Sequence, residues 1–155
     1  MTTRFLLVLI LGQLVVGCSN DNPAAKTDYT QLSGVSGDFS DHRGKWMVIN
    51  YWATWCKPCI EEIPELNNFA EKHKDTVKLF AVDFDNARGD KLVASAEKMG
   101  IEFPILIDDP HSLLGFEKPY ALPTTFVFNP QGKLQKTLLG PQTEESLLKA
   151  LAMKD

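Results

Sequence analysis

Two thiols, Cys56 and Cys59, stand three positions apart and are the clearest candidates for reactive residues in this sequence. They follow an apolar, strand-like run at 46–52 and open a helix-like run that begins near Lys57. At the start of a helix this spacing places both thiols on one face, where their sulfurs can reach disulfide geometry. The positive end of the helix dipole and the Lys57 ammonium would both lower the pKa of the Cys56 thiol. A thiolate that attacks a disulfide, with a second thiol to resolve the mixed disulfide, forms a reversible two-electron redox couple.

A Cys-x-x-Cys pair also occurs in zinc sites and in structural disulfides. A closed zinc site takes four ligands, and the remaining candidates, His42, His73 and His111, are not paired at ligand spacing. A structural disulfide that closes so short a loop would remove little chain entropy. Redox activity is therefore the favoured interpretation, with no metal and no cofactor expected. On this hypothesis Cys56 is acidic and faces solvent, whereas Cys59 is shielded.

Length and charge limit the class of protein. The chain has 155 residues, of which 44% are hydrophobic and 23% charged, which suits one globular domain with its own core. Its net charge is -4 and it has no basic stripe, which argues against a nucleic-acid partner.

The third cysteine, Cys18, follows an apolar N-terminal segment. Residues 5–16 form a run of about a dozen mostly apolar residues after Arg4, which fits a signal peptide and is shorter than the ~20 residues of a membrane span. The run ends in Val-Val-Gly-Cys, which resembles the lipobox of bacterial lipoproteins. That resemblance implies cleavage before Cys18 and lipidation of its sulfur. The alternatives are an ordinary secretory signal with a spare thiol, or an uncleaved anchor.

These features predict a signal peptide at 1–17, a flexible tether at 18–29 and one domain at 30–155. The tether is polar and has no periodicity, and ten such residues reach at most about 35 Å. The domain would therefore work close to a membrane, in the bacterial cell envelope and facing the periplasm. In Gram-negative lipoproteins a Ser directly after the lipidated Cys favours the outer membrane, and Ser19 occupies that position.

Apolar runs and turn signals predict a mixed α/β domain. After one or two short edge strands between residues 30 and 45, strands are expected at 46–52, 77–84, 103–107, 124–128 and 133–139, and helices at 57–74, 89–99, 111–116 and from Thr143 onward. Strands and helices alternate and then give way to a hairpin and a closing helix. This order describes a three-layer α/β sandwich with a mixed sheet.

The segment 50–64, Asn-Tyr-Trp-Ala-Thr-Trp-Cys-Lys-Pro-Cys-Ile-Glu-Glu-Ile-Pro, is followed much later by Leu122-Pro123-Thr124. Together they resemble the thioredoxin superfamily, and more closely its exported TlpA/ResA-like thiol–disulfide oxidoreductases. Asp83 and Pro123 lie forty residues apart, which leaves room for the extra helix and strand of this branch. The resemblance implies a thioredoxin-like α/β/α sandwich with a helix–strand insertion, in which Cys56 attacks a substrate disulfide and Cys59 resolves the intermediate.

The same resemblance assigns the surroundings of the pair. It implies a cis peptide bond before Pro123, which leaves the Leu122 backbone free to pair with an extended substrate; the alternative is a trans-Pro turn. Trp55 would form an apolar rim with Lys57 and Pro58 beside it. The sequence leaves open whether Lys57 stabilises the Cys56 thiolate or is simply solvated. We expect Trp52 and Trp55 to be packing residues, His111 to lie on the surface at a helix start, and Asp108-Asp109-Pro110 to be a strand-end turn.

Glu62 is the third candidate catalytic residue. On a helical period it lies with Cys59 and the apolar Leu66 and Phe69, so burial should raise its pKa and suit it to accept the Cys59 proton. Asn50 stands where plain thioredoxins carry a buried Asp, and the TlpA/ResA-like pattern has a Glu at the position of Glu62. The alternative is an exposed Glu without a role.

The leading hypothesis is therefore a lipid-anchored envelope oxidoreductase that reduces protein disulfides. Pro58 before the second Cys resembles the reducing thioredoxins, and relatives receive electrons from a membrane thiol reductase. A role in cytochrome c maturation is one option, although Thr124 replaces the Glu common in that branch. The alternatives are a thiol peroxidase of related fold and a copper-binding chaperone that uses both thiols and a His such as His111.

Overall fold

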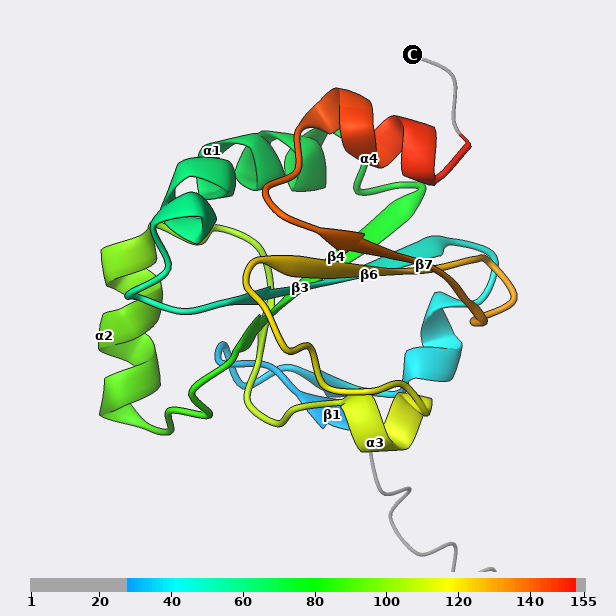
Figure 1. Ribbon diagram of the computed structural model, residues 1–155. Coiled ribbons are helices and arrows are strands. Elements are labelled where there is room, and N and C mark those ends of the chain that lie inside the picture. Colours follow the sequence, from blue (N-terminus) through cyan, green and yellow to red (C-terminus); the bar gives the residue numbers. More distant parts are fainter. Residues whose placement is uncertain (1–27, 153–155) are drawn as a thin grey trace, which may run out of the picture.

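The computed structural model describes residues 28–152; Cys18, the signal segment and most of the predicted tether lie outside the described residues. In chain order the elements are β1 (Tyr29–Thr30), β2 (Ser36–Gly37), the 3-10 helix η1 (Phe39–His42), β3 (Trp46–Trp52), α1 (Lys57–Lys72), β4 (Val77–Asp83), α2 (Asp90–Met99), β5 (Ile105–Leu106), α3 (His111–Leu114), β6 (Thr124–Phe128), β7 (Leu134–Leu139) and α4 (Glu144–Ala150) (Figure 1). Buried Tyr29 belongs to β1, so the folded domain includes a residue that the sequence placed in the tether. Within this part of the chain no helix has the length and apolar character to span a membrane.

Five strands form a mixed sheet in the order β5-β4-β3-β6-β7. Strands β3, β4 and β5 are parallel, and β6 and β7 continue the sheet as an antiparallel hairpin. Strand β5 is shorter than predicted. Pro104 accepts a hydrogen bond from Ala81 N–H but has no N–H to donate, so the regular ladder begins at Ile105. The predicted edge strands β1 and β2 pair with each other, and a single bridge from Gln31 to Leu106 joins them to the edge of the main sheet.

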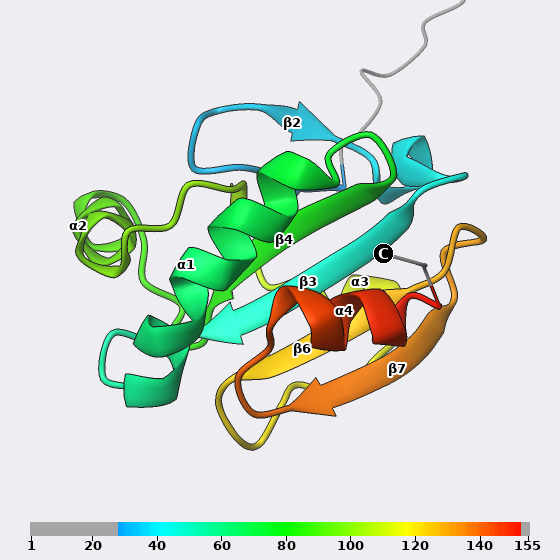
Figure 2. The same cartoon turned by 90° about the horizontal axis from the view of Figure 1, so that it is seen from above.

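The sheet separates two apolar clusters, which confirms the predicted three layers. Helices α1 and α4 cover one face, and α3, η1 and the β1–β2 hairpin lie on the other (Figure 1). Helix α2 flanks the β4 side of the sheet (Figure 2), and it forms the predicted insertion together with β5. Alternation along β3 sends Val48 and Trp52 into the first cluster and Ile49 and Tyr51 into the second. In this part of the chain, the face of the sheet opposite α1 and α4 is thus covered by short elements only (Figure 1).

Candidate active site

Cys56 and Cys59 are joined by a disulfide at the N-terminus of α1, with their Cα atoms 5.3 Å apart. Cys56 is the N-cap residue of the helix, and its sulfur accepts a hydrogen bond from Cys59 N–H at 3.2 Å. Pro58 occupies the first turn of the helix, where a residue without an N–H is tolerated. The same N–H and the helix dipole would stabilise a thiolate on Cys56 after reduction.

The expectation that Cys56 faces solvent is wrong for this disulfide form. Only 4% of Cys56 and none of Cys59 is exposed, and both belong to the apolar cluster beneath α1. The physical reason is that a disulfide draws the Cys56 sulfur toward Cys59, whose side chain lies on the buried face of the helix. Cys56 is still the more accessible of the two, so a partner would reach the pair through this residue.

Lys57 extends into solvent. Its ammonium nitrogen lies 3.7 Å from Glu61 Oε1, and both side chains are largely exposed. This i,i+4 pair on the outer face of α1 favours the solvated role over stabilisation of the Cys56 thiolate. Lys57 is nevertheless beside the disulfide and is available to a docking partner.

Glu62 lies on the buried face of α1, one turn beyond Cys59, and is 2% exposed. Asn50 Nδ2 donates to Glu62 Oε1 at 2.8 Å, and Gln142 N–H donates to Oε2 at 2.8 Å. Burial raises the pKa of Glu62 to about 7, against the smaller lowering effect of these two hydrogen bonds. A group with a pKa near neutrality is suited to accept and return a proton.

Two partners in this network, Thr125 and Gln142, are not predicted from the sequence. Asn50 Nδ2 also donates to Thr125 Oγ1 at 3.0 Å, because β3 and β6 pair Asn50 with Thr125. Gln142 lies in the turn between β7 and α4, and its side-chain amide donates to Gly140 O. The contribution of Gln142 to Glu62 is a backbone N–H, which any residue except Pro could supply. No side-chain pattern in the sequence could have identified it.

The segment before β6 completes the site. The Leu122–Pro123 bond is cis, and Pro123 O accepts a hydrogen bond from Gly140 N–H at 3.0 Å. Strand register pairs Thr124 with Tyr51, so Leu122 and Pro123 lie beside the end of β3 from which the Cys segment departs. Within residues 28–152 Leu122 makes no backbone hydrogen bond, which leaves its N–H and C=O for an extended partner strand.

Trp52 packs in the core as predicted, whereas the expectation that Trp55 is also a packing residue is wrong, because Trp55 is 64% exposed. It lies at the rim beside the disulfide, and its indole N–H donates to Asp85 at 2.9 Å. Its ring meets Phe84 edge to face, with centroids 6.4 Å apart. An exposed indole next to an activated thiol is an apolar surface that a partner protein can cover.

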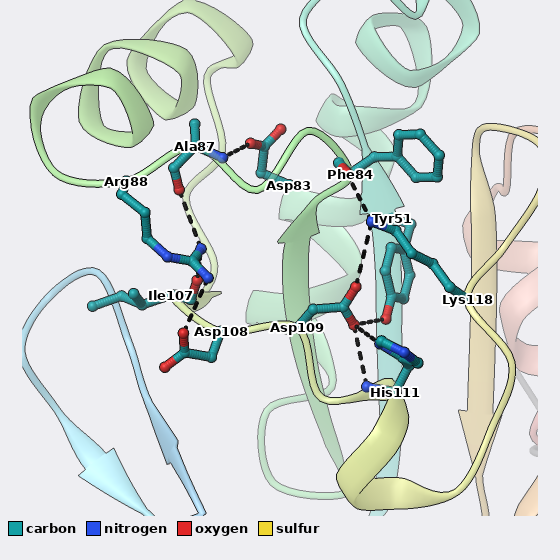
Figure 3. Close-up of polar contacts among 10 residues, drawn as sticks. All are labelled: Tyr51, Asp83, Phe84, Ala87, Arg88, Ile107, Asp108, Asp109, His111 and Lys118. Carbon is teal, nitrogen blue, oxygen red and sulfur yellow. Dashed lines mark hydrogen bonds and ion pairs between the residues drawn. The ribbon is translucent and has the colours of Figure 1, made fainter.

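The segment 108–110, predicted as a simple strand-end turn, also supplies a carboxylate that points into the fold. Asp109 is largely buried and accepts a hydrogen bond from the Tyr51 hydroxyl, and His111 lies beside it at the start of α3 (Figure 3). In the described part of the chain no group of three or more His, Cys, Asp and Glu side chains could hold a metal ion.

Comparison with known proteins supports the chemistry of the pair. A family model described as the AhpC/TSA family matches residues 15–137. The thiol-disulfide oxidoreductase ResA of Bacillus anthracis is 35% identical over 120 residues, which cover 76% of this chain and 68% of ResA. The thioredoxin-like protein YneN of Bacillus subtilis is 32% identical over 137 residues, or 85% of this chain and 78% of YneN.

Among solved structures, StoA from Bacillus subtilis has a TM-score of 0.64 and 27% identity, with 79% of this chain and 92% of StoA covered. The thioredoxin-like fold expected from the sequence is therefore confirmed. The chain belongs to the AhpC/TSA family, and it is a thioredoxin-like thiol–disulfide oxidoreductase.

Proposed function

We propose that this oxidoreductase reduces disulfides in exported proteins while a lipid on Cys18 holds it in the bacterial cell envelope. The observation that carries the chemistry is the Cys56–Cys59 disulfide at a helix N-terminus, with buried Glu62 one turn further along the same helix face. The lipid anchor rests on the Val-Val-Gly-Cys motif, and Ser19 favours the outer membrane if the cell is Gram-negative.

The reaction passes two electrons from the protein dithiol to the substrate. The Cys56 thiolate attacks one sulfur of a substrate disulfide, which forms a mixed disulfide and releases the other substrate sulfur as a thiolate. Cys59 gives its proton to Glu62 and attacks the Cys56 sulfur. This second step forms the Cys56–Cys59 disulfide and releases the remaining substrate thiolate, which takes up a proton.

The rest of the site supports binding of a polypeptide. Leu122 has free backbone groups for an extended substrate segment and is followed by Pro123 through a cis bond. Pro58 lies between the two cysteines in the first turn of α1, and Trp55 and Lys57 offer apolar and polar contacts beside the pair. The spent disulfide must be reduced again, and we assign this step to a membrane thiol reductase. Cytochrome c maturation is a narrower option for the substrate.

Mixed-disulfide trapping in cells tests this function. In Cys59→Ser the intermediate cannot resolve, so substrates should remain attached through Cys56 and be released by dithiothreitol. The matched control is the double variant Cys56→Ser/Cys59→Ser, which should trap nothing. Equal recovery of adducts from both variants, or failure of the purified wild-type dithiol to reduce insulin, would contradict the proposal.

A peroxide assay separates this function from a thiol peroxidase. With dithiothreitol as donor, the wild-type protein should consume hydrogen peroxide no faster than the double Cys variant does. Turnover of peroxide that exceeds turnover of insulin would favour the peroxidase.

A further inference from the structure

Lys118 connects three segments at the active-site end of the sheet. It lies in the segment that leads from α3 to Pro123, and its ammonium donates to the Phe84 carbonyl at 3.1 Å (Figure 3). The same nitrogen lies 4.7 Å from the centroid of the Phe84 ring and 3.8 Å from Asp109 Oδ2. One cation thus holds the end of β4 against the segment that follows β5.

Asp109 is a fixed anchor for this cation, because its side chain is only 10% exposed. Its Oδ1 accepts hydrogen bonds from the Tyr51 hydroxyl and from His111 N–H. The His111 ring nitrogen Nδ1 lies 3.0 Å from the same oxygen without hydrogen-bond geometry. Oδ2 receives no hydrogen bond from any residue in 28–152, and Lys118 is the basic side chain that faces it. A buried carboxylate oxygen in this position strongly favours a cation beside it.

The contact continues from Lys118 to the rim of the active site. The Lys118 ammonium lies over the Phe84 ring, and the Phe84 ring packs edge to face against the Trp55 indole. The Phe84 N–H also donates to Trp52 O, so the segment that follows β4 is bonded to the end of β3. The one hydrogen bond of the Trp55 side chain within residues 28–152 goes to exposed Asp85, and an exposed hydrogen bond alone restrains a side chain weakly.

We propose that Lys118 is a positioning residue that acts through Phe84 to keep the Trp55 indole in one orientation beside the Cys56–Cys59 pair. It thereby sets the affinity for a polypeptide substrate without taking part in the thiol chemistry. This inference rests on the proposed function. Freezing one side chain on binding weakens affinity by about 2- to 10-fold, and this is the loss expected when Lys118 no longer holds the rim.

Steady-state kinetics with two substrates of different size tests the inference. Lys118→Met keeps the length of the side chain and removes its charge, Lys118→Arg restores the charge, and Lys149→Met on the exposed face of α4 is the matched control. With insulin, Lys118→Met should raise KM by about 2- to 10-fold at unchanged kcat, and Lys118→Arg should recover most of this loss. With bis(2-hydroxyethyl) disulfide, which is too small to cover the rim, all variants should react at the wild-type rate. An equal loss with both substrates would overturn the inference.

The mobility of the Trp55 indole provides a second readout that needs no catalysis. The order parameter of its Nε1–H, measured by ¹⁵N relaxation in the oxidised protein, should fall in Lys118→Met and in Phe84→Leu and stay unchanged in Lys149→Met. Unchanged values in both test variants would also overturn the inference. If wild-type protein fails to reduce insulin, the proposed function is refuted, and the indole measurement alone decides the role of Lys118.

Discussion

Glu62 should make the stability of the protein depend on pH, because its pKa rises from 4.5 to about 7 on burial. Between these values the folded protein keeps a proton that the unfolded chain has lost, so the free energy of unfolding falls as pH rises. Each unit of pKa difference corresponds to about 1.4 kcal/mol. The loss therefore amounts to about 3 kcal/mol and is complete once the pH exceeds the folded pKa.

Glu62→Gln removes the titration and keeps the shape of the side chain. The amide can still accept from Asn50, but its NH₂ group would face the Gln142 N–H that now donates to Glu62. One unsatisfied buried donor costs about 1–3 kcal/mol at every pH. The informative quantity is therefore the difference in unfolding free energy between variant and wild type, which should shift in favour of the variant by about 3 kcal/mol between pH 4.5 and pH 8.

Urea unfolding of the oxidised proteins at a series of pH values between 4.5 and 8.5 measures this difference. Glu61→Gln is the matched control, since Glu61 is the exposed neighbour on the outer face of α1 and forms an exposed ion pair with Lys57. Its curve should run parallel to that of the wild type. If the Glu62→Gln curve is also parallel, burial does not raise the pKa of this carboxyl and its assignment as the proton acceptor for Cys59 loses its physical basis.

Three further substitutions test neighbouring contacts. Asn50→Asp places a second buried carboxylate against Glu62, so unfolding free energy should drop by about 3–5 kcal/mol at pH 8 and by less at pH 5; equal losses at both pH values would contradict this. Lys57→Met should change the alkylation rate of reduced Cys56 by less than about twofold, because the Lys57 ammonium is paired in solvent; a tenfold fall would restore its role in stabilising the thiolate. Thr143→Ala removes the N-cap acceptor of α4 and should lower the unfolding free energy by about 1 kcal/mol in urea, and an unchanged midpoint would show that the cap is dispensable.

The sequence predicts the buried position of Glu62 because helical periodicity assigns faces without reference to the rest of the fold. It does not predict the partners of Glu62. The Gln142 donor is a backbone N–H that lies 80 residues from Glu62 in the sequence. Its position depends on how the segment before α4 packs against α1. The five strands of the sheet are likewise predicted from apolar runs and turn signals, whereas β5 is shorter than predicted because Pro104 cannot donate to the ladder.

The error at Cys56 and the open question at Lys57 have a common physical origin. Proximity along the chain places the Lys57 ammonium close to the Cys56 sulfur, but it does not give the direction of either side chain. One helix position separates a core-facing residue from a solvent-facing one, and the Lys57 ammonium lies 3.7 Å from Glu61 on the outer face. The burial of Cys56 depends on the disulfide and the packed face of α1, neither of which residue spacing can specify.

Strand β3 positions the two carboxylates on which both proposals depend, Glu62 and Asp109. Its alternation sends Asn50 to the α1 side, where it bonds Glu62, and Tyr51 to the opposite side, where it bonds Asp109. The next residue, Trp52, ends β3, and four residues later Cys56 caps α1. Glu62, the proposed proton acceptor, and Asp109, the proposed anchor of Lys118, are therefore positioned by consecutive residues, yet within residues 28–152 they share no hydrogen-bond partner. Because of this separation, a substitution below the sheet can change affinity for a substrate and leave the thiol chemistry above it intact.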